Sequence, residues 1–244
     1  MESFYGKLLR CLEKEILFAL ATVISGQALG KKMLIQPNGC TEGSLESLQL
    51  NQEVRKSALG LLKRQISEKY SCEINGERTE VFIEVFSPSP KLIIIGAVHL
   101  SISLITFAKA LGFKTIVIDP RSVFATPERF RHADEVIIEW PHEVLSASDF
   151  DEGTYLVALS HDAKLDNPAL KLALESPCRY VGALGSLKTH ARRIGALEEM
   201  GVSKEQISRI HAPVGLNLGG RRPEDIALSI IAQIVAVKHG RSEK

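Results

Sequence analysis

The sequence has few cysteines and no long apolar run, and both shortages narrow the class of protein. Its four cysteines are Cys11, Cys40, Cys72 and Cys178. They lie far apart and form no C-x-x-C pair, so neither a disulfide framework nor a zinc finger is predicted. The longest early apolar run, residues 16–24, is too short to span a bilayer and does not resemble a cleaved signal peptide. We therefore expect a cytoplasmic protein with reduced thiols, no metal site and no membrane span.

Net charge is nearly absent as well. The chain has 30 Lys and Arg residues against 29 Asp and Glu, which gives a formal net charge of +1. Because positive and negative charges are so evenly balanced, the protein as a whole has no positive field that would attract nucleic acid or an anionic membrane. Any anion must therefore bind at a local cluster of donors or positive charges. The 244 residues are enough for one large domain or for two of ordinary size.

The segment SPSP, residues 87–90, separates two parts of different pattern. Its two prolines interrupt both helix and sheet, and we place a domain boundary there. Residues 1–86 are predicted to form a small α+β domain. The expected elements are a helix at 4–14, strands at 16–24 and 31–39, a helix at 45–68, and two strands within 73–86 joined by a turn at Asn75-Gly76.

Residues 91–244 instead alternate short apolar strands with helical segments. This alternation predicts an α/β domain with a Rossmann-like parallel sheet covered by helices on both faces. The expected strands are 91–96, 114–119, 135–140, 154–160 and 178–185; the expected helices are 99–111, one opened by Thr126-Pro127, 142–146, one opened by Asn167-Pro168, 188–200 and one after Pro223. Ligands of such sheets bind beyond the carboxyl ends of the strands, so the glycines that follow strands are the first candidates for a site.

The end of the first of these strands fits the dinucleotide fingerprint poorly. Laid on G-x-G-x-x-G, the segment IIIGAVHLS places Gly96, Val98 and Ser101 at the three glycine positions. The branched Val98 side chain stands where backbone normally approaches a pyrophosphate. Asp119 nevertheless ends the next strand, where an acid that binds ribose would lie. The geometry indicates a Rossmann-type sheet that has lost or changed its usual NAD ligand.

A histidine and a carboxylate, His161 and Asp162, follow the strand at 154–160. At a carboxyl end they could transfer a proton or contact a ligand, and we favour a site role for both. Asp166 or Asn167 could instead cap the helix that Pro168 begins, and for Asn167 we favour the cap. No serine nucleophile elbow or metalloprotease motif is present, and the sequence identifies no catalytic residue.

The most informative stretch is HAPVGLNLGGRRPEDIALSI, residues 211–230. Glycine allows backbone to approach a ligand closely, and proline suits the first position of a helix. Three glycines, two arginines and a proline therefore predict a cationic loop whose amide groups bind an anion at a helix start. The residues are Gly215, Gly219, Gly220, Arg221, Arg222 and Pro223. A tight loop that only closes the domain is the alternative.

A second loop of this kind follows the strand at 178–185. Gly182, Gly185 and Ser186 precede a helix that carries Lys188 and a pair of arginines. A glycine turn, a hydroxyl and a helix start together suit a phosphate or a polar heterocycle. Two such loops at one sheet edge favour a bound anion over coincidence.

The segments of the second domain, in this order, resemble the XdhC family of xanthine dehydrogenase accessory factors. The resemblance covers residues 91–240 and rests on IIIGAVHL, VIDPRSVFATPERF, LSHDAKLDNPAL, YVGALGSLKTHARRI and APVGLNLGGRRPEDIALSIIAQIVAVKHG. It implies an accessory protein, not a turnover enzyme, that binds the molybdenum cofactor, protects it during sulfuration and delivers it to apo molybdenum hydroxylases. The implied partners are the apoenzyme, a cysteine desulfurase and a second copy of the chain.

The resemblance also implies a set of cofactor-binding residues. Carried over by position, these are Gly96, His99, Asp119, Arg121, His161, Asp162, Gly182, Gly185, Ser186, Gly215, Asn217, Gly219, Pro223 and Glu224. The first domain departs from the family pattern, because VISGQALGKKM and EGSLESL lack the arginine of the family's G-S-x-P-R segment and the cysteine of its G-G-C-x-E segment. Cys40 lies near the second segment but out of register, and no role is assigned to it.

Three hypotheses follow. The first is a maturation protein that binds the molybdenum cofactor. The second is an NAD(P)-dependent oxidoreductase, suggested by the sheet order together with Asp119 and His161. The third is a scaffold that binds the apoenzyme and no cofactor, with glycine loops that serve only the fold.

Overall fold

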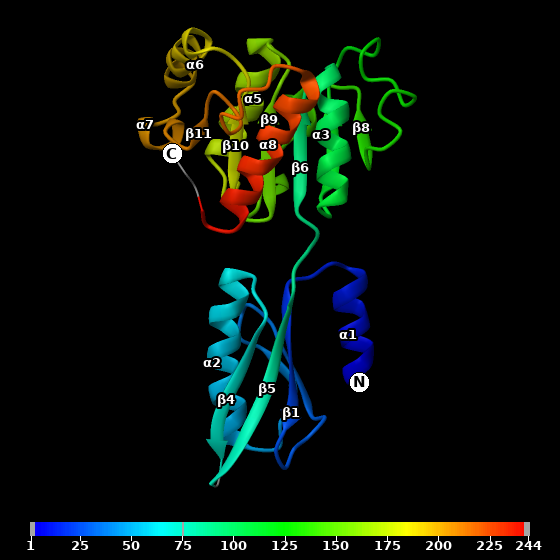
Figure 1. Ribbon diagram of the computed structural model, residues 1–244, viewed down its shortest axis with the longest axis vertical. Helices are drawn as coiled ribbons and strands as arrows, with labels where there is room; N and C mark the ends of the chain where they lie inside the picture. Colours follow the sequence, from blue (N-terminus) through cyan, green and yellow to red (C-terminus); the bar gives the residue numbers. More distant parts are fainter. Residues whose placement is uncertain (1–2, 75, 242–244) are drawn as a thin grey trace. The chain divides into compact units, whose positions relative to one another are not determined.

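The computed structural model describes residues 3–74 and 76–241, and the chain divides into two compact units, one ending at Pro88 and one beginning at Ser89. The first unit is an antiparallel sheet with two helices (Figure 1). Its elements are α1 (Phe4–Glu13), β1 (Phe18–Ser25), β2 (Lys32–Ile35), β3 (Thr41–Gly43), α2 (Leu48–Arg64), β4 (Glu68–Ile74) and β5 (Glu77–Phe86). The strand order is β3-β2-β1-β5-β4. The short β3 was not expected, and the predicted turn residue Asn75 lies outside the described residues.

Helix α2 shows why this unit folds as it does. Ser47 accepts a hydrogen bond from the Leu50 N–H and so caps the first turn. Leu50, Val54 and Ala58 recur at helical spacing and are buried in one cluster with the inward residues of β1, β2 and β5. Gln65 ends the helix in the left-handed conformation.

The second unit is a six-stranded sheet with the order β11-β10-β9-β6-β7-β8, in which every neighbouring pair is parallel. Its strands are β6 (Lys91–Ile95), β7 (Lys114–Ile118), β8 (Glu135–Ile137), β9 (Thr154–Ala158), β10 (Tyr180–Ala183) and β11 (Ile210–His211). The order reverses between β6 and β9, as in a Rossmann sheet, and ligands of such sheets bind in the crevice beyond this switch point. The fold class predicted from the sequence is confirmed.

Helices cover both faces of this sheet (Figure 1). They are α3 (His99–Ala110), α4 (Pro141–Val144), α5 (Ala163–Leu174), α6 (Leu187–Glu199), α7 (Lys204–Ile207) and α8 (Pro223–Lys238), with a 3₁₀ turn at Ala147–Asp149. Apolar residues of α3 and α8 form one buried cluster with one face of the strands, and those of α5 and α6 form a second cluster with the other face. The strands are apolar on both sides because both sides are buried.

Two helix predictions are wrong. The segment at Thr126-Pro127 forms turns, and although the Phe130 N–H donates to the Thr126 carbonyl at 3.1 Å, no helix continues from this single turn. Helix α5 starts at Ala163, so Pro168 lies inside it and Asn167 is a buried helical residue. Asn167 is therefore not the cap. Asp162 takes that position, and its carboxylate accepts a hydrogen bond from the Lys164 N–H at 2.9 Å.

Candidate functional site

The switch point of the sheet is closely packed at Gly96. This glycine has φ +108°, and a Cβ there would lie 2.8 Å from both Cα and N of Ser160. Its carbonyl accepts a 2.7 Å hydrogen bond from the buried Ser101 hydroxyl. Gly96 is thus required by the approach of β6 to the end of β9, and Ser160 occupies the space beside it. The structure does not bring Gly96 into the lining of a described cavity.

Asp119, predicted at the position of a ribose-binding acid, is instead held within the protein. Its buried carboxylate accepts hydrogen bonds from the Ala97 N–H at 2.8 Å and from the Arg121 N–H at 3.0 Å, and Arg121 also contacts both oxygens through its guanidinium. Burial opposes ionisation of Asp119, but the hydrogen bonds from Arg121 and Ala97 outweigh it and hold the pKa below its usual value. The Arg121 guanidinium lies 4.8 Å from the Phe124 ring centroid.

The two predicted histidines of this edge are exposed. His99 is the first residue of α3, where Val98 provides no side-chain cap. His161 has φ +61°, in the left-handed region that a non-glycine residue adopts only at some cost. Neither residue is among those that line a described cavity. Their predicted site roles stay predictions.

A buried polar network lies behind His161. Asp166, 1% exposed, accepts a 2.7 Å hydrogen bond from Ser160, and its other oxygen is 3.7 Å from Arg193, which is 6% exposed. Burial raises the pKa of Asp166 against the opposing effects of Ser160 and Arg193, and burial also lowers the pKa of Arg193. Nη1 of Arg193 and Nδ1 of His190 are buried without hydrogen-bond partners. This network was not predicted from the sequence.

The glycine-rich loop ahead of α8 lines a cavity of about 610 Å³, called here the loop cavity. Its lining combines loop residues with residues from the first turns of α8 and the residue that follows β10. The lining residues are Leu184, Pro213, Val214, Gly215, Leu216, Asn217, Leu218, Gly219, Gly220, Arg221, Asp225, Ile226 and Ser229. The structure therefore brings five of the predicted site residues together: Gly215, Asn217, Gly219, Gly220 and Arg221.

Two of these glycines are required by packing. Gly215 has φ +94°, its N–H donates to Oε1 of Gln233 at 2.9 Å, and a Cβ there would lie 2.3 Å from the Ser229 hydroxyl. At Gly220 a Cβ would lie 2.3 Å from Cβ of Asp225. Gly219, with φ +78°, instead faces open space. The loop thus lies tightly on α8 at Gly215 and Gly220 and stands away from it at Gly219.

Backbone donors of this loop are available to a ligand. Within the described chain, the N–H groups of Asn217, Gly219, Gly220 and Arg221 make no hydrogen bond to protein. All four residues are exposed or partly exposed. Successive free N–H groups in a loop with a glycine at positive φ form an anion-binding concavity, and the Arg221 side chain adds a positive charge.

The N-terminus of α8, beside the loop, is less available to a bound anion than we predicted from the sequence. Glu224 and Asp225 lie in the first turn of α8. Asp225 accepts a hydrogen bond from the Arg222 N–H at 3.3 Å and lies 3.6 Å from the Arg222 guanidinium. The Asp225 carboxylate thus already interacts with the N-terminal end of α8, and the positive charge of Arg222 lies beside Asp225.

The turn between β10 and α6 serves mainly as structure. Gly182 is buried within β10, where a Cβ would lie 2.6 Å from Val214. Ser186 caps α6 by accepting from the Thr189 N–H at 3.2 Å. Leu184, in this turn, lines the loop cavity, whereas Gly185 and Ser186 are not among its lining residues. The apolar wall made by Leu184, Leu216 and Leu218 was not predicted.

No set of donors in the described residues suits a metal. Among residues 3–74 and 76–241 no three histidine, cysteine or acidic side chains gather in a way that could hold an ion. Cys178, in the second unit, is 2% exposed, and burial raises the pKa of its thiol to about 12. Over the same residues, no helix combines the length and the apolar character needed to cross a bilayer.

Comparisons with known proteins agree with this architecture. The model of the XdhC Rossmann domain family matches residues 92–234. The chain is 29% identical over 93% of its length to the uncharacterised Escherichia coli protein YqeB, 30% over 66% to a probable xanthine dehydrogenase component of Bacillus subtilis, and 36% over 40% to the Escherichia coli molybdenum cofactor insertion chaperone PaoD. It spans 44%, 47% and 31% of these relatives.

A solved structure has the same fold. The crystal structure of a xanthine dehydrogenase from Bacillus halodurans superposes with a TM-score of 0.58 at 21% identity, and the match covers 97% of this chain and 96% of that one. The likeness includes both units of the chain.

Proposed function

The chain belongs to the XdhC family, and from this premise we propose that it is an accessory protein that binds the molybdenum cofactor and supplies it to apo molybdenum hydroxylases. The names of two relatives, a molybdenum cofactor insertion chaperone and a probable xanthine dehydrogenase component, support this role. The same proposal includes action in the cytoplasm, self-association and contact with the apoenzyme and a cysteine desulfurase.

One observation carries the binding half of the proposal: the free N–H groups and the arginine of the loop cavity. A phosphate group offers several oxygen acceptors and negative charge, and it fits the donors at Asn217, Gly219, Gly220 and Arg221. A volume of about 610 Å³ lies within the range of cavities that take small molecules. The site therefore fits a phosphate-bearing ligand the size of a pterin.

The rest of the lining would orient such a ligand. Leu184, Leu216 and Ile226 provide apolar surface against which a ring can pack. The second unit provides no accessible thiolate, because Cys178 is buried and its pKa is raised. The chain would thus hold the cofactor by its phosphate and ring. The cofactor would supply the dithiolene-bound metal to the recipient enzyme.

The proposal is tested by measuring pterin bound to the purified protein. The chain is produced anaerobically in cells that make the cofactor and in cells that cannot, and bound pterin is quantified by fluorescence after oxidation. We expect pterin only from the first preparation, and less with Arg221→Ala. Arg192→Ala is the matched control, because Arg192 is an exposed cation of α6 outside the loop cavity. Absence of pterin from every preparation would overturn the proposal.

The side chains at the switch point of the sheet do not favour the oxidoreductase hypothesis. Asp119 is engaged by Arg121 and Ala97, and Ser160 occupies the space beside Gly96. A nucleotide present at a hundredfold its dissociation constant would add about 2.7 kcal/mol to stability. Thermal melting with NAD⁺, NADH, NADP⁺ and NADPH should show no such shift.

The scaffold hypothesis makes the opposite prediction about cofactor dependence. A scaffold would bind the apo hydroxylase equally well when the host cannot make molybdopterin. We expect recovery of the hydroxylase with the tagged chain to fall in such a host. Equal recovery, together with absence of bound pterin, would favour the scaffold.

A further inference from the structure

Two neighbouring helices of the second unit have outward sides with very little charge. Helices α3 and α8 lie side by side on one face of the parallel sheet (Figure 1). No residue of α8 from Ile226 to Val237 is charged, and no residue of α3 from Leu100 to Ala108 is charged. The outward side of a helix in a globular protein normally carries charged residues, as α6 does at Arg192. The outward side of α3 and α8 instead has the composition of an interface.

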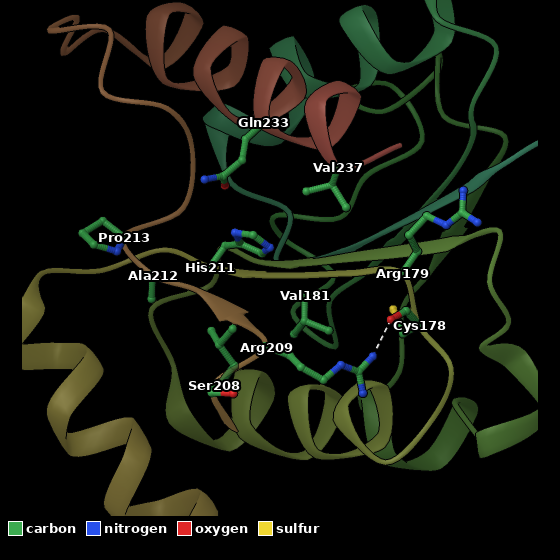
Figure 2. A pocket seen from close by; sticks show the side chains of 11 residues that line it. Cys178, Arg179, Val181, Ser208, Arg209, His211, Ala212, Pro213, Gln233 and Val237 are labelled. Atoms are coloured by element: carbon green, nitrogen blue, oxygen red, sulfur yellow. Dashed lines mark hydrogen bonds between the residues drawn. The ribbon is translucent and has the colours of Figure 1, made fainter. Parts of the chain in front are cut away.

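The inward side of α8 is occupied by contacts within its own unit. Ile230 and Ile234 are buried in the apolar cluster that α8 shares with α3 and the sheet. Gln233 accepts hydrogen bonds from the Tyr180 hydroxyl at 2.6 Å and the Gly215 N–H at 2.9 Å, and Figure 2 shows its side chain pointing from α8 toward the sheet edge. These contacts explain the apolar character of the inward side only.

A stripe of residues at helical spacing runs along the opposite, outward side of α8. The stripe consists of Glu224, Leu228, Ala232, Val235 and His239. Leu228 is 48% exposed, and Ala232 and Val235 are partly exposed. The middle of the stripe is thus apolar and accessible, whereas its two ends are an acid and a histidine. An apolar stripe of this kind gains free energy when another apolar surface covers it.

The adjoining surface of α3 adds few polar groups that would lose hydrogen bonds to water. Thr106 is exposed, but its hydroxyl donates to the Ile102 carbonyl at 3.1 Å and is therefore satisfied within the helix. Lys109, near the end of α3, pairs with Asp134 at 2.6 Å. Covering α3 would therefore leave few polar groups without a partner.

The stripe on α8 is complementary to itself when two copies pack antiparallel. Leu228 and Val235, like Glu224 and His239, are equally distant in sequence from a point just before Ala232. A two-fold axis at that point sets Leu228 level with Val235 of the second copy. It also brings the acidic first turn of each α8 beside the basic last turn of the other. Ala232 is small, so the two helix axes can approach closely where they cross.

The distribution of charge favours a second copy of the chain over an unrelated partner. In a two-fold interface the same surface faces itself, so an unbalanced charge near the axis would meet a charge of the same sign. A surface that is uncharged in the middle and oppositely charged at its two ends avoids this repulsion. An interface with a different protein carries no such requirement, so self-association explains the symmetry of the stripe about Ala232.

The extent of the surface is sufficient for a weak dimer. The 16 residues of α8 correspond to a length of about 24 Å, and two packed helices are about 20 Å wide. The surface therefore measures roughly 480 Å² per copy, or about 1,000 Å² for two copies, which is the lower end of the range for specific interfaces.

We propose that two copies of the chain associate through the outward surface of α3 and α8, with the two α8 helices antiparallel about a two-fold axis beside Ala232. The inference rests on the proposed function in one respect, because self-association is part of that function, and it adds the surface and the symmetry. It depends on no contact with the cofactor, since Leu228, Ala232 and Val235 do not line the loop cavity.

The oligomeric state of the full chain tests this surface. Sedimentation velocity is measured on protein from cells that cannot make the molybdenum cofactor. We expect a dimer with a dissociation constant on the order of 10 µM, since the interface is small. Leu228→Lys would place a charge opposite Val235 of the second copy and should weaken the dimer at least about tenfold. Because Leu228 is about half exposed, the variant should keep the circular dichroism of the wild type.

Leu187→Lys is the matched control. Leu187 is 71% exposed on α6, whose apolar residues pack on the other face of the sheet. This substitution adds the same charge to an exposed leucine outside the proposed surface and should leave the association unchanged. A monomeric wild-type chain, or equal effects of the two substitutions, overturns the proposal.

Exchanging the charges at the two ends of the stripe tests the symmetry. Glu224→Lys and His239→Glu should each weaken the dimer about threefold or more, because each sets like charges opposite one another. The double variant should recover most of the wild-type affinity. Recovery supports the antiparallel arrangement, and weakening without recovery overturns it.

Measurement of bound pterin separates this inference from the proposed function. A dimer that binds no pterin in any preparation would support the surface and overturn the cofactor role. A monomer that binds pterin would overturn the surface and leave the cofactor role in place.

Discussion

Asp119 and Arg121, two residues apart at the carboxyl end of β7, form a two-point ion pair. Nε of Arg121 donates to Oδ1 at 2.8 Å and Nη2 donates to Oδ2 at 2.7 Å, and the Ala97 N–H also donates to Oδ2. The carboxylate therefore links the turn after β6 to the end of β7 by hydrogen bonds. An acid in this position of a nucleotide-binding sheet would instead face a ribose.

Asp119→Asn should destabilise the second unit. The amide cannot accept on both sides, so a donor from Ala97 or Arg121 loses its partner. We expect a loss of about 2 to 4 kcal/mol in the free energy of unfolding, less than for a wholly buried pair because the Arg121 side chain is 36% exposed. Urea denaturation at neutral pH, followed by circular dichroism, measures this loss.

The pH dependence of that loss has a definite sign. The folded-state pKa of Asp119 is lowered, so the pair contributes stability above the unfolded pKa of about 3.9 and loses it as the pH falls through the folded pKa. The difference between wild type and Asp119→Asn should therefore be constant near neutral pH and shrink below about pH 4. A difference that persists undiminished in acid would contradict this account.

Gly96→Ala should be strongly destabilising. A Cβ at φ +108° would lie 2.8 Å from the backbone of Ser160, and neither strand can shift without breaking its ladder. We expect a loss of at least about 2 kcal/mol in thermal or urea unfolding. Gly195→Ala is the control, because Gly195 lies inside α6 with open space around it and should gain about 0.5 to 1 kcal/mol. Equal effects at the two positions would exclude the close approach as the cause.

Asp162→Ala should remove the cap of α5. The carboxylate accepts from the Lys164 N–H, and loss of such a cap costs about 1 kcal/mol. Asp162→Asn keeps an acceptor at the same place and should retain most of the stability. Urea unfolding of the three proteins at neutral pH separates capping from any charge effect. If Asn is as destabilising as Ala, the charge of Asp162 and not its capping bond is what matters.

The two loop arginines should differ in ligand binding. Arg221 lines the loop cavity, whereas Arg222 lies 3.6 Å from Asp225. Arg221→Ala should weaken an anionic ligand by about 1 to 3 kcal/mol, and Arg222→Ala should have a smaller effect. Competition against the bound pterin, measured by fluorescence, gives both affinities. A larger loss for Arg222 would mean that the ligand displaces Asp225.

Much of the fold could be predicted because it depends on local patterns. Apolar runs such as Leu92–Ile95 and Tyr155–Ala158 are too short for helices and are buried on both sides, which is typical of parallel strands. The prolines at 88 and 90 mark the end of the first unit. The extra strands β3 and β11 were missed, since two or three residues carry no periodicity.

The site was predicted less completely. The run from Gly215 to Arg221 does line one cavity, but Gly96 and Gly182 serve close packing against Ser160 and Val214. A glycine in the sequence can indicate that another group approaches the backbone closely. The sequence does not show whether that group is a ligand or a neighbouring part of the protein.

The sequence by itself determined the parallel sheet, its covering helices and the glycine loop ahead of α8, because each depends on residues adjacent in the chain. Only the tertiary structure decided that Asp162 caps α5 while Asp166 turns inward to Ser160, and that Gln233 meets Gly215 and Tyr180. The contacts of Asp162 and Asp166 lie within one segment, but which of the two carboxylates faces inward depends on how α5 packs on the sheet. Gln233 lies 53 residues from Tyr180 and 18 residues from Gly215, and only the packing of α8 on the sheet brings these residues together.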